Sequence, residues 1–244
     1  MNRELEILGR EKVIGIVGGM GPEATLDLYR EILRATPAQK DQDHLRVIID
    51  SNPKIPDRTP AITGAGASPV PAMAMSCRAV ARAGADFVII PCISAHYFLD
   101  ELRQQIDIPV LSAFDAVSEY IAARHTDVSR VGLLATSGTI TGGRFAACLA
   151  DHGIATIVPD KDYQASLMAA IYQIKASLDP QVRAQCRADL IATATPAIAK
   201  GAQGIIAGCT EIPLELKPPD LSVPLFNPLA ILAQAAVERA VKPS

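Results

Sequence analysis

Residues 84–92 read Gly-Ala-Asp-Phe-Val-Ile-Ile-Pro-Cys, and residues 201–209 repeat this stretch as Gly-Ala-Gln-Gly-Ile-Ile-Ala-Gly-Cys. The offset is 117 residues, counted from Cys92 to Cys209. The same offset relates other parts of the chain: 14–17 to 131–134, and Gly21 to Gly138. Each copy is an apolar run of strand length that ends in a cysteine, where a polar turn begins. The repeat predicts two similar halves that each present one thiol to a shared cleft.

Strand-like and helix-like runs alternate along the chain. This alternation favours β-α units and mostly parallel sheets. We therefore predict an α/β fold of two pseudo-symmetric three-layer α/β/α lobes, with the active site in the cleft between them. The first lobe is expected to span 1–112 together with 222–244, because a final helix over 229–241 packs on the first half. The second lobe is expected to span 113–221.

The composition is that of a soluble α/β protein, with 49% of the 244 residues hydrophobic and 20% charged. The formal net charge of -3 gives no electrostatic reason to expect nucleic acid or a membrane as a partner. Residues 1–6 are too charged for a signal peptide, and no apolar run reaches membrane-spanning length. Five cysteines without a Cys-x-x-Cys pair argue against disulfides and a structural zinc site. These features predict a cytoplasmic protein without a bound metal.

Two of the cysteines are the leading candidates for chemistry. The other three lie within helical patterns and are expected to be packed inside the protein: Cys77, Cys148 and Cys186. Cys92 and Cys209 instead end a strand and precede a helix, at the sheet edge where α/β proteins bind ligands. Backbone N–H groups and the helix dipole at that edge favour a thiolate. Inversion of a carbon centre requires such a pair of matched proton carriers on opposite sides of a substrate.

Two further patterns have competing interpretations. Residues 19–24 (Gly-Met-Gly-Pro-Glu-Ala) fit a loose dinucleotide fingerprint, which would favour a nicotinamide-dependent oxidoreductase. The alternative is a backbone turn that approaches a small carboxylate at a helix N-terminus. Cys92 and His96 have a spacing that suits a hydrolytic dyad or a metal site, but also a neutral histidine that packs or caps locally. The Gly- and Pro-rich stretch 60–71 is expected to be a mobile loop that acts as a lid.

Four longer motifs carry a family resemblance: 18–25 (Gly-Gly-Met-Gly-Pro-Glu-Ala-Thr), 51–59 (Ser-Asn-Pro-Lys-Ile-Pro-Asp-Arg-Thr), 91–97 (Pro-Cys-Ile-Ser-Ala-His-Tyr) and 208–213 (Gly-Cys-Thr-Glu-Ile-Pro). Together they resemble the cofactor-independent aspartate/glutamate racemases of the Asp/Glu/hydantoin racemase superfamily, over nearly the whole chain. The resemblance implies two pseudo-symmetric lobes, a site between them, no pyridoxal phosphate or metal, and usually a homodimer. The implied substrate is a small amino acid, aspartate or glutamate.

The resemblance also implies roles for individual residues. Cys92 and Cys209 match the acid/base pair of the family, one from each lobe. Arg58 matches the arginine that holds the side-chain carboxylate of the substrate, and Lys175 is similar to a lysine close to it. The positions that line the substrate correspond to Met20, Asn52, Ser94 and Thr210.

Two departures from the family pattern bear on activity. Ile93 stands where the family has asparagine, and isoleucine cannot hydrogen-bond a carboxylate. Residues 226–228 read Phe-Asn-Pro where the family often has an aspartate–threonine pair. Two alternatives therefore stay open. One is a related two-cysteine isomerase of the maleate or hydantoin type, and the other is a weakly active or non-catalytic protein that binds a dicarboxylate.

Overall fold

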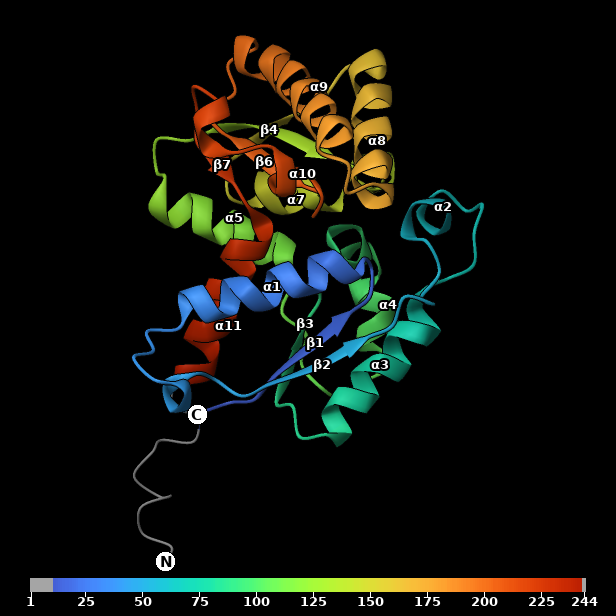
Figure 1. Ribbon diagram of the computed structural model, residues 1–244, viewed down its shortest axis with the longest axis vertical. Coiled ribbons are helices and arrows are strands. Elements are labelled where there is room, and N and C mark those ends of the chain that lie inside the picture. Colours follow the sequence, from blue (N-terminus) through green and yellow to red (C-terminus); the bar gives the residue numbers. More distant parts are fainter. Residues whose placement is uncertain (1–10, 243–244) are drawn as a thin grey trace, which may run out of the picture.

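The computed structural model describes residues 11–242, which form two α/β lobes, one above the other in Figure 1. The charged residues 1–6, from which the sequence argues against a signal peptide, lie outside this range. Within the range, no helix has both the length and the apolar character needed to cross a membrane. Both lobes contain parallel sheets with helices packed on them, so the predicted α/β class is confirmed.

The sheet of the first lobe has the strand order β2-β1-β3, and its strand pairs are parallel. Its strands are β1 (Ile14–Gly18), β2 (Val47–Ser51) and β3 (Phe87–Ile89). Val110 extends the sheet by one parallel bridge to Val88. All five residues of β1 are buried, because helices cover both faces of the sheet. A strand buried on both faces reads as a nearly continuous aliphatic run, which is how the sequence signals it.

Helices α1 and α11 lie on one face of this sheet and α3 on the other. The helices of this part of the molecule are α1 (Pro22–Ala35), α2 (Arg58–Ile62), α3 (Val70–Arg82), α4 (Leu99–Arg103) and α11 (Pro228–Val241), with 3-10 turns at Asp41–Asp43 and Ile93–Phe98. Helix α5 (Ala113–Arg124) lies at the boundary with the second lobe and packs against α11. In α1, Leu28 and Ile32 face the core one turn apart, and Pro22 occupies the first turn, where its missing N–H costs nothing.

The second lobe repeats this arrangement with a fully parallel sheet of order β5-β4-β6-β7. Its strands are β4 (Arg130–Ala135), β5 (Ala155–Ile157), β6 (Ile205–Gly208) and β7 (Leu225–Phe226). Its helices are α6 (Ser137–Gly142), α7 (Arg144–Asp151), α8 (Lys161–Ala176), α9 (Pro180–Ala199) and α10 (Ile212–Glu215), with a 3-10 turn at Pro218–Asp220.

The strand orders show the internal repeat directly. In each lobe the first strand, β1 or β4, is flanked by the second strand on one side and by the strand that leads to a cysteine on the other. The bridge at Val110 in the first lobe has its counterpart in β7 of the second. The pseudo-symmetry predicted from the offset of 117 residues is therefore present in the fold.

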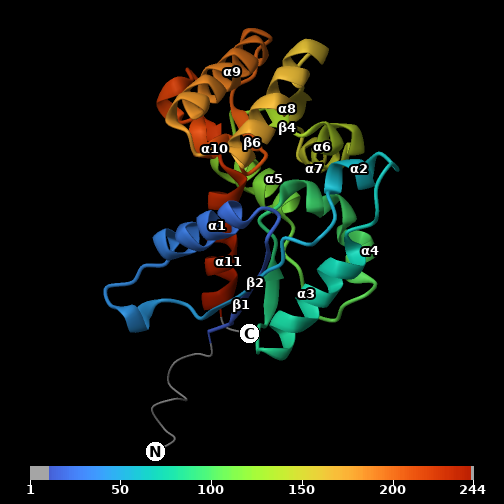
Figure 2. The same ribbon diagram turned by 45° about the vertical axis from the view of Figure 1, so that its right-hand side comes forward.

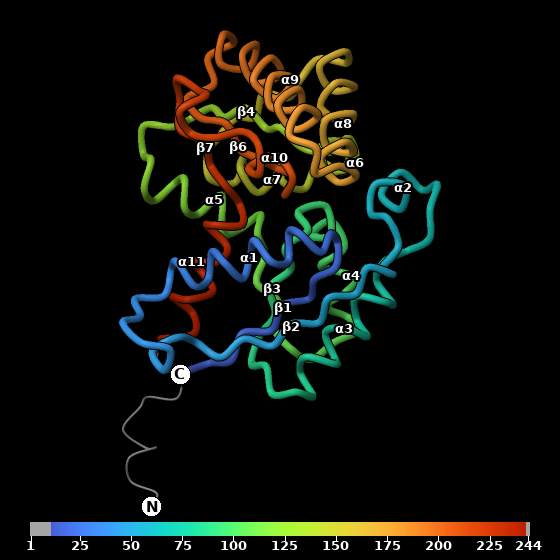
Figure 3. Tube along the Cα trace, viewed as in Figure 1, coloured from blue at the N-terminus to red at the C-terminus, as the bar shows by residue number. Residues whose placement is uncertain are grey.

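The chain crosses between the lobes near α5 and again between β7 and α11, as the tube in Figure 3 shows in green and in red. The expected boundary at residue 222 lies shortly before β7. Leu225 and Phe226 still pair with β6, in the second sheet. The crossing follows them, where the side chain of Asn227 accepts a hydrogen bond from Leu229 N and caps α11.

The stretch 60–71, expected to be a mobile loop, begins inside a helix. Asp57 caps α2 by accepting a hydrogen bond from the N–H of Thr59. Helix α2 packs against α6 of the other lobe, and the turned view in Figure 2 shows the two side by side. A Cβ atom added at Gly138 would lie 3.1 Å from Cα of Thr59, so the glycine permits a close approach. This segment thus already covers one end of the boundary between the lobes.

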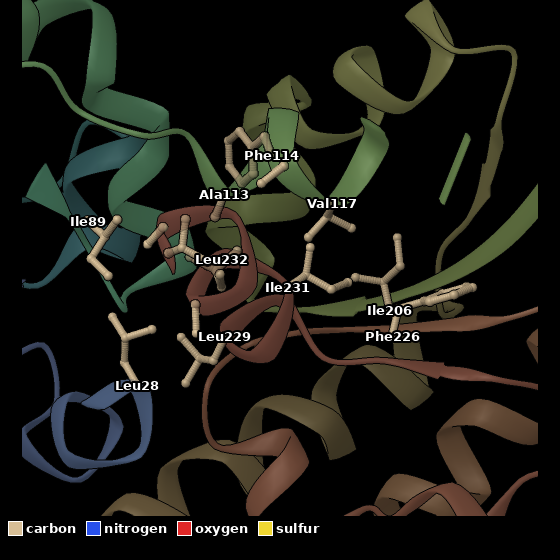
Figure 4. Packing of buried hydrophobic residues seen from close by; sticks show 14 of the residues in the cluster. Leu28, Ile89, Ala113, Phe114, Val117, Ile206, Phe226, Leu229, Ile231 and Leu232 are labelled. Atoms are coloured by element: carbon tan, nitrogen blue, oxygen red, sulfur yellow. The ribbon is translucent and has the colours of Figure 1, made fainter. Parts of the chain in front are cut away.

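One hydrophobic cluster runs through both lobes (Figure 4). Ile89 and Leu28 of the first lobe contribute to it, as do Ile206 and Phe226 of the second. Helices α5 and α11 supply the residues between them, among which Figure 4 labels Phe114, Val117, Leu229, Ile231 and Leu232. The apolar packing is continuous along this side, so any separation of the lobes is expected to pivot here.

Candidate active site

A pocket at the boundary of the lobes contains both cysteines that end the repeated strands. The first lobe contributes Met20, Asp57, Arg58, Thr59, Cys92, Ile93 and Ser94, and the second contributes Thr136, Ile171, Tyr172, Lys175, Gly208, Cys209, Thr210 and Glu211. Both cysteines reach the pocket because the carboxyl ends of parallel strands meet at one edge of a sheet, and the two sheets turn these edges toward each other.

Cys92 lies just beyond β3, at the start of the 3-10 turn Ile93–Phe98. Only 5% of the residue is exposed. Its Sγ atom is 3.4 Å from Oγ of Ser94, which is itself buried. A hydroxyl at this distance can donate a hydrogen bond to a thiolate or accept one from a thiol.

Cys209 follows β6 directly and is equally buried. Its Sγ atom donates to Oε2 of Glu211 over 2.9 Å, and Oγ1 of Thr210 donates to the same oxygen over 3.0 Å. Burial and the Glu211 carboxylate raise the pKa of the Cys209 thiol well above its ordinary value, although Lys175 acts in the opposite direction. The Cys209 sulfur thus directly contacts a carboxylate.

Arg58 is a buried cation at the start of α2. Its Nη1 atom donates to the carbonyl oxygens of Pro56 at 2.8 Å and Ile55 at 3.4 Å, while Nη2 lies 3.5 Å from Met20 O. Burial by itself lowers the pKa of Arg58, but the adjacent Cys92 raises it, and the net change is upward. The buried Nε atom has no hydrogen-bond partner, so part of the guanidinium is left for another group.

Lys175 lies near the end of α8, with Nζ 3.7 Å from Oε1 of Glu211. Burial lowers the pKa of Lys175, but Glu211 and the two pocket cysteines raise it, so the net direction is upward. Arg58 and Lys175 are themselves separated by the repeat offset of 117 residues. Each lobe therefore supplies one cysteine and one cation to the pocket.

The structure brings together most of the residues predicted to form the site. Met20, Ser94 and Thr210 line the pocket with the cysteines and the two cations. Asn52 does not line it. Its side chain accepts a hydrogen bond from Lys54 N, and its backbone lies against Gly19, where an added Cβ would come within 2.3 Å. Asn52 shapes the turn that leads to Arg58.

The backbone of the glycine-rich turn at 19–21 forms hydrogen bonds with Thr25 of the same chain. Oγ1 of Thr25 accepts a hydrogen bond from Gly19 N over 2.8 Å and donates one to Gly21 O over 3.0 Å. The close backbone approach at Gly19, which has a φ of 88°, is toward Asn52. The contact with Asn52 gives Gly19 a structural reason that involves no nucleotide, and Met20 of the same turn lines the pocket.

His96 is not a partner of Cys92. Its Nε2 atom lies 3.0 Å from Ile90 O, and its Nδ1 atom accepts a hydrogen bond from Ala113 N over 3.1 Å. Both ring nitrogens are therefore held by the backbone, and burial lowers the pKa of His96 to about 4. Of the two interpretations of this residue, the neutral packed histidine is the one that the structure bears out. The residues described here also include no group of three or more His, Cys, Asp or Glu side chains placed to hold a metal ion.

The other cysteines are packing residues. Cys77 and Cys186 are buried, and burial raises the pKa of each thiol, to about 12 in the case of Cys77. Cys148 is partly buried and donates to Asp115 over 3.5 Å. Burial and this carboxylate raise the pKa of Cys148 to about 11. Thiols of this kind are unreactive at neutral pH.

Glu211 is the principal site residue for which the sequence predicts no role. It lies within the motif 208–213, but nothing in the motif alone distinguishes a buried acid from a surface one. A usable signal exists in the repeat: Ser94 and Glu211 are equivalent by the offset of 117 residues, as are Ile93 and Thr210. The two residues after each cysteine thus differ between the halves, at positions that line the pocket.

The pocket is nearly closed. The volume open to the centre of a water-sized sphere is about 20 Å³. One water molecule needs roughly 10–15 Å³ on this measure, so the space does not hold an amino acid. Entry of any substrate therefore requires the lobes, or the α2 segment, to move apart.

Comparison with known proteins agrees with this geometry. The family model for Asp/Glu/Hydantoin racemase matches residues 17–236. The broad specificity amino-acid racemase RacX of Bacillus subtilis is 25% identical over 235 residues, which cover 92% of this chain and 96% of that protein. Among solved structures, the aspartate racemase of Picrophilus torridus has a TM-score of 0.81 and 27% identity, covering 94% of each chain. The putative Asp/Glu racemase of Yersinia pestis has a TM-score of 0.78 and 28% identity, covering 95% of this chain and all of that one. The chain therefore belongs to the Asp/Glu/Hydantoin racemase family and is an isomerase of the amino-acid racemase type.

Proposed function

We propose that the protein racemises aspartate or glutamate by proton transfer between two cysteines, Cys92 and Cys209. The observation that carries the proposal is that these two residues, equivalent in the internal repeat, line the same pocket from opposite lobes. Each lies beyond the carboxyl end of its strand, buried and free of any disulfide. No residue assigned to the reaction requires a cofactor.

The proposed reaction uses one thiolate and one thiol. The thiolate takes the α-proton of the substrate, and the thiol returns a proton to the opposite face of the same carbon. The α-proton is far less acidic than a thiol, so most of the catalysis must come from positioning and from groups that stabilise negative charge. The two cations support a dicarboxylate substrate, because Arg58 and Lys175 together match two carboxylates. Ser94, Thr210 and backbone N–H groups complete the assignment as hydrogen-bond donors.

Exchange of the α-proton in deuterated water tests this proposal. The protein is incubated with each enantiomer of aspartate and glutamate, and deuterium at Cα is followed by NMR together with the optical rotation. Deuterium incorporation accompanied by loss of optical rotation is expected. The double variant Cys92→Ser, Cys209→Ser is expected to show neither. Binding of a dicarboxylate without exchange would instead favour the non-catalytic alternative.

A second candidate substrate class follows from the apolar wall of the pocket. Ile93 and Ile171 both line it. RacX, which is similar over most of the chain, is described as a broad specificity amino-acid racemase. Amino acids with neutral side chains are therefore part of the screen, and faster exchange with them than with aspartate and glutamate would identify this class. Activity on maleate or hydantoins, tested in parallel, would identify the remaining alternatives.

The homodimer implied by the family resemblance is part of the proposal as well. Sedimentation velocity at micromolar concentration measures it directly. A single monomeric species would contradict this expectation without bearing on the chemistry.

A further inference from the structure

The carboxylate of Glu211 breaks the symmetry of the cysteine pair. Glu211 and Ser94 occupy equivalent positions in the repeat, each two residues after a cysteine. Oγ of Ser94 lies 3.4 Å from Sγ of Cys92, whereas Oε2 of Glu211 lies 2.9 Å from Sγ of Cys209. One sulfur therefore faces a hydroxyl and the other faces an acid.

The short contact between Cys209 and Glu211 requires at least one proton on the pair. A thiolate has no hydrogen to donate, and two anions 2.9 Å apart at a buried site repel each other strongly. Both residues are at least 94% buried, so water screens this repulsion little. Thr210 donates to the same carboxylate oxygen, and Lys175 lies 3.7 Å from the other one. These two contacts place a hydroxyl donor and a cation on the Glu211 carboxylate, which favours the proton on the Cys209 sulfur.

Cys92 has the opposite surroundings. The Arg58 guanidinium lines the same pocket as Cys92, and the nearby Cys92 raises the pKa of the arginine. Ser94 supplies a hydroxyl that can donate to the same sulfur. A neighbouring cation and a hydrogen-bond donor are the surroundings that stabilise a thiolate.

We infer that Cys92 is the thiolate and Cys209 the thiol in the ligand-free protein, and that Glu211 is the positioning residue that sets this assignment. The inference deepens the proposed two-cysteine reaction and rests on it for its catalytic meaning. The Cα–H bond breaks and its proton forms an S–H bond on Cys92, while the electron pair stays on Cα. Cα then takes the proton from Cys209, whose sulfur is left as a thiolate. Loss of a proton from Cys92 to water and uptake of one by Cys209 restores the starting state.

The assignment makes the two directions of the reaction unequal in their first step. The enantiomer whose α-hydrogen faces Cys92 meets a base that is ready to act. The other enantiomer meets the thiol of Cys209, and it reacts only after the protons have been redistributed. In a single turnover, α-proton exchange is therefore expected to be faster for one enantiomer, whereas the equilibrium constant between the enantiomers stays at one.

Alkylation of the cysteines as a function of pH tests the assignment without any turnover. The protein is treated with iodoacetamide between pH 6 and pH 10, and the modification of Cys92 and Cys209 is followed separately by peptide mass spectrometry. Only the thiolate reacts, so the pH midpoint of each curve reports ionisation independently of access. In the wild-type protein, Cys209 is expected to react with a midpoint above that of Cys92. Glu211→Gln is expected to lower the Cys209 midpoint by about one pH unit or more, because it removes the adjacent like charge.

Two further variants keep the result interpretable. Glu238→Gln, on α11 away from the pocket, makes the same change of charge and is expected to leave both midpoints unchanged. Glu211→Ser reproduces the arrangement at Ser94. It replaces Glu211→Gln in this experiment if circular dichroism shows that the glutamine variant does not fold. A Cys209 midpoint below that of Cys92 in the wild type would overturn the inference, as would an unchanged midpoint in both Glu211 variants. Failure of the racemase proposal is seen separately, as absence of deuterium exchange with every amino acid.

Discussion

Arg183 of α9 contacts Glu23 of α1, with 3.3 Å between Nη2 and Oε2, and so joins the two lobes. A second cross-lobe ion pair links Arg144 of α7 to Asp100 of α4 at 2.5 Å, and the Arg144 guanidinium also lies over the ring of Tyr97. The pocket between the lobes is too small for an amino acid in this arrangement. Passage of substrate therefore requires contacts of this kind to break and to form again.

The double variant Glu23→Gln, Arg144→Ala is expected to favour the open form. Exposed ion pairs contribute little to stability, so the free energy of unfolding is expected to fall by about 1 kcal/mol or less for each pair. Hydrogen exchange in α2 and α6 is expected to become faster, and KM for the amino-acid substrate is expected to rise. Arg124→Ala is the matched control, because its ion pair with Glu238 joins α5 to α11 away from the pocket. Equal rates of backbone hydrogen exchange in α2 and α6 of the double variant and of the control would show that the two cross-lobe ion pairs do not hold the lobes together.

Single replacement of either pocket cysteine is expected to abolish racemisation. A serine hydroxyl is far too weak an acid and base for this proton transfer at neutral pH, so Cys92→Ser and Cys209→Ser each remove one face of the reaction. Each variant is expected to keep its fold by circular dichroism, and one of them is expected to exchange the α-proton of one enantiomer only. Cys77→Ser is the control for loss of a buried thiol. Wild-type turnover in either pocket variant would exclude the two-base mechanism.

His96 is expected to make folding stability depend on pH below neutrality. Burial lowers its pKa to about 4 in the folded protein, from about 6.5 in the unfolded chain. The unfolded state therefore binds more protons between these values, and stability falls as pH decreases from about 6.5 to about 4. The loss amounts to roughly 3 kcal/mol at the lower end. Urea unfolding at pH 7.5, 6 and 5 measures it, and His96→Gln is expected to flatten the dependence while the exposed His152→Gln leaves it in place. A parallel decline in all three proteins would assign the effect to other groups.

The internal repeat made much of the fold predictable. The apolar runs that end at Cys92 and Cys209 become β3 and β6 in equivalent sheets, because strands buried on both faces have few sequence solutions. Residues 223–227 repeat the pattern of 108–112, so even the two-residue strand β7 has a sequence counterpart, at the bridge of Val110. The pattern alone does not show that β7 belongs to the second sheet, because this depends on its pairing with β6.

The candidate site was predictable only in part. The cysteines could be found because each ends a strand, and strand ends meet at one edge. Glu211 could not be found in this way, because the sequence alone does not distinguish a glutamate that contacts a buried thiol from one that contacts water. Bringing Lys175 to Glu211 also depends on how α8 packs in the second lobe, which no local pattern encodes. The family resemblance, rather than residue spacing, pointed to Arg58 and Lys175.

Arg58→Lys is expected to weaken binding of acidic substrates more than neutral ones. Arg58 already donates to the backbone of Pro56 and Ile55, so only a group with several fixed donors can keep these bonds and hold a carboxylate as well. Loss of one charge-assisted bond corresponds to roughly a tenfold rise in KM for aspartate or glutamate. Steady-state kinetics on acidic and neutral amino acids measures the difference, with the exposed Arg46→Lys as control. Equal losses on both substrate classes would make Arg58 a structural residue of the turn.

Ile93→Asn is expected to increase activity on aspartate and glutamate at a cost in stability. Ile93 lines the pocket beside Cys92, but it is only 2% exposed and also belongs to the hydrophobic cluster that contains Phe114. An asparagine there offers an amide to a substrate carboxylate, and a bond to a charged group typically contributes about 1.5–3 kcal/mol. The same change removes a buried aliphatic side chain, which is expected to lower the free energy of unfolding by roughly 2–3 kcal/mol.

The two effects of the substitution are separable by measurement. kcat/KM on both acidic amino acids is expected to rise several-fold in Ile93→Asn, while urea unfolding shows the loss of stability. Ile93→Val is the matched control, because it removes one methylene, destabilises by about 0.5–1.5 kcal/mol and adds no hydrogen-bonding group. An improvement in the asparagine variant alone would show that Ile93 limits acidic substrates in the natural sequence. If Ile93→Asn and Ile93→Val lose stability without any gain in activity, the side chain at this position serves the core rather than the choice of substrate.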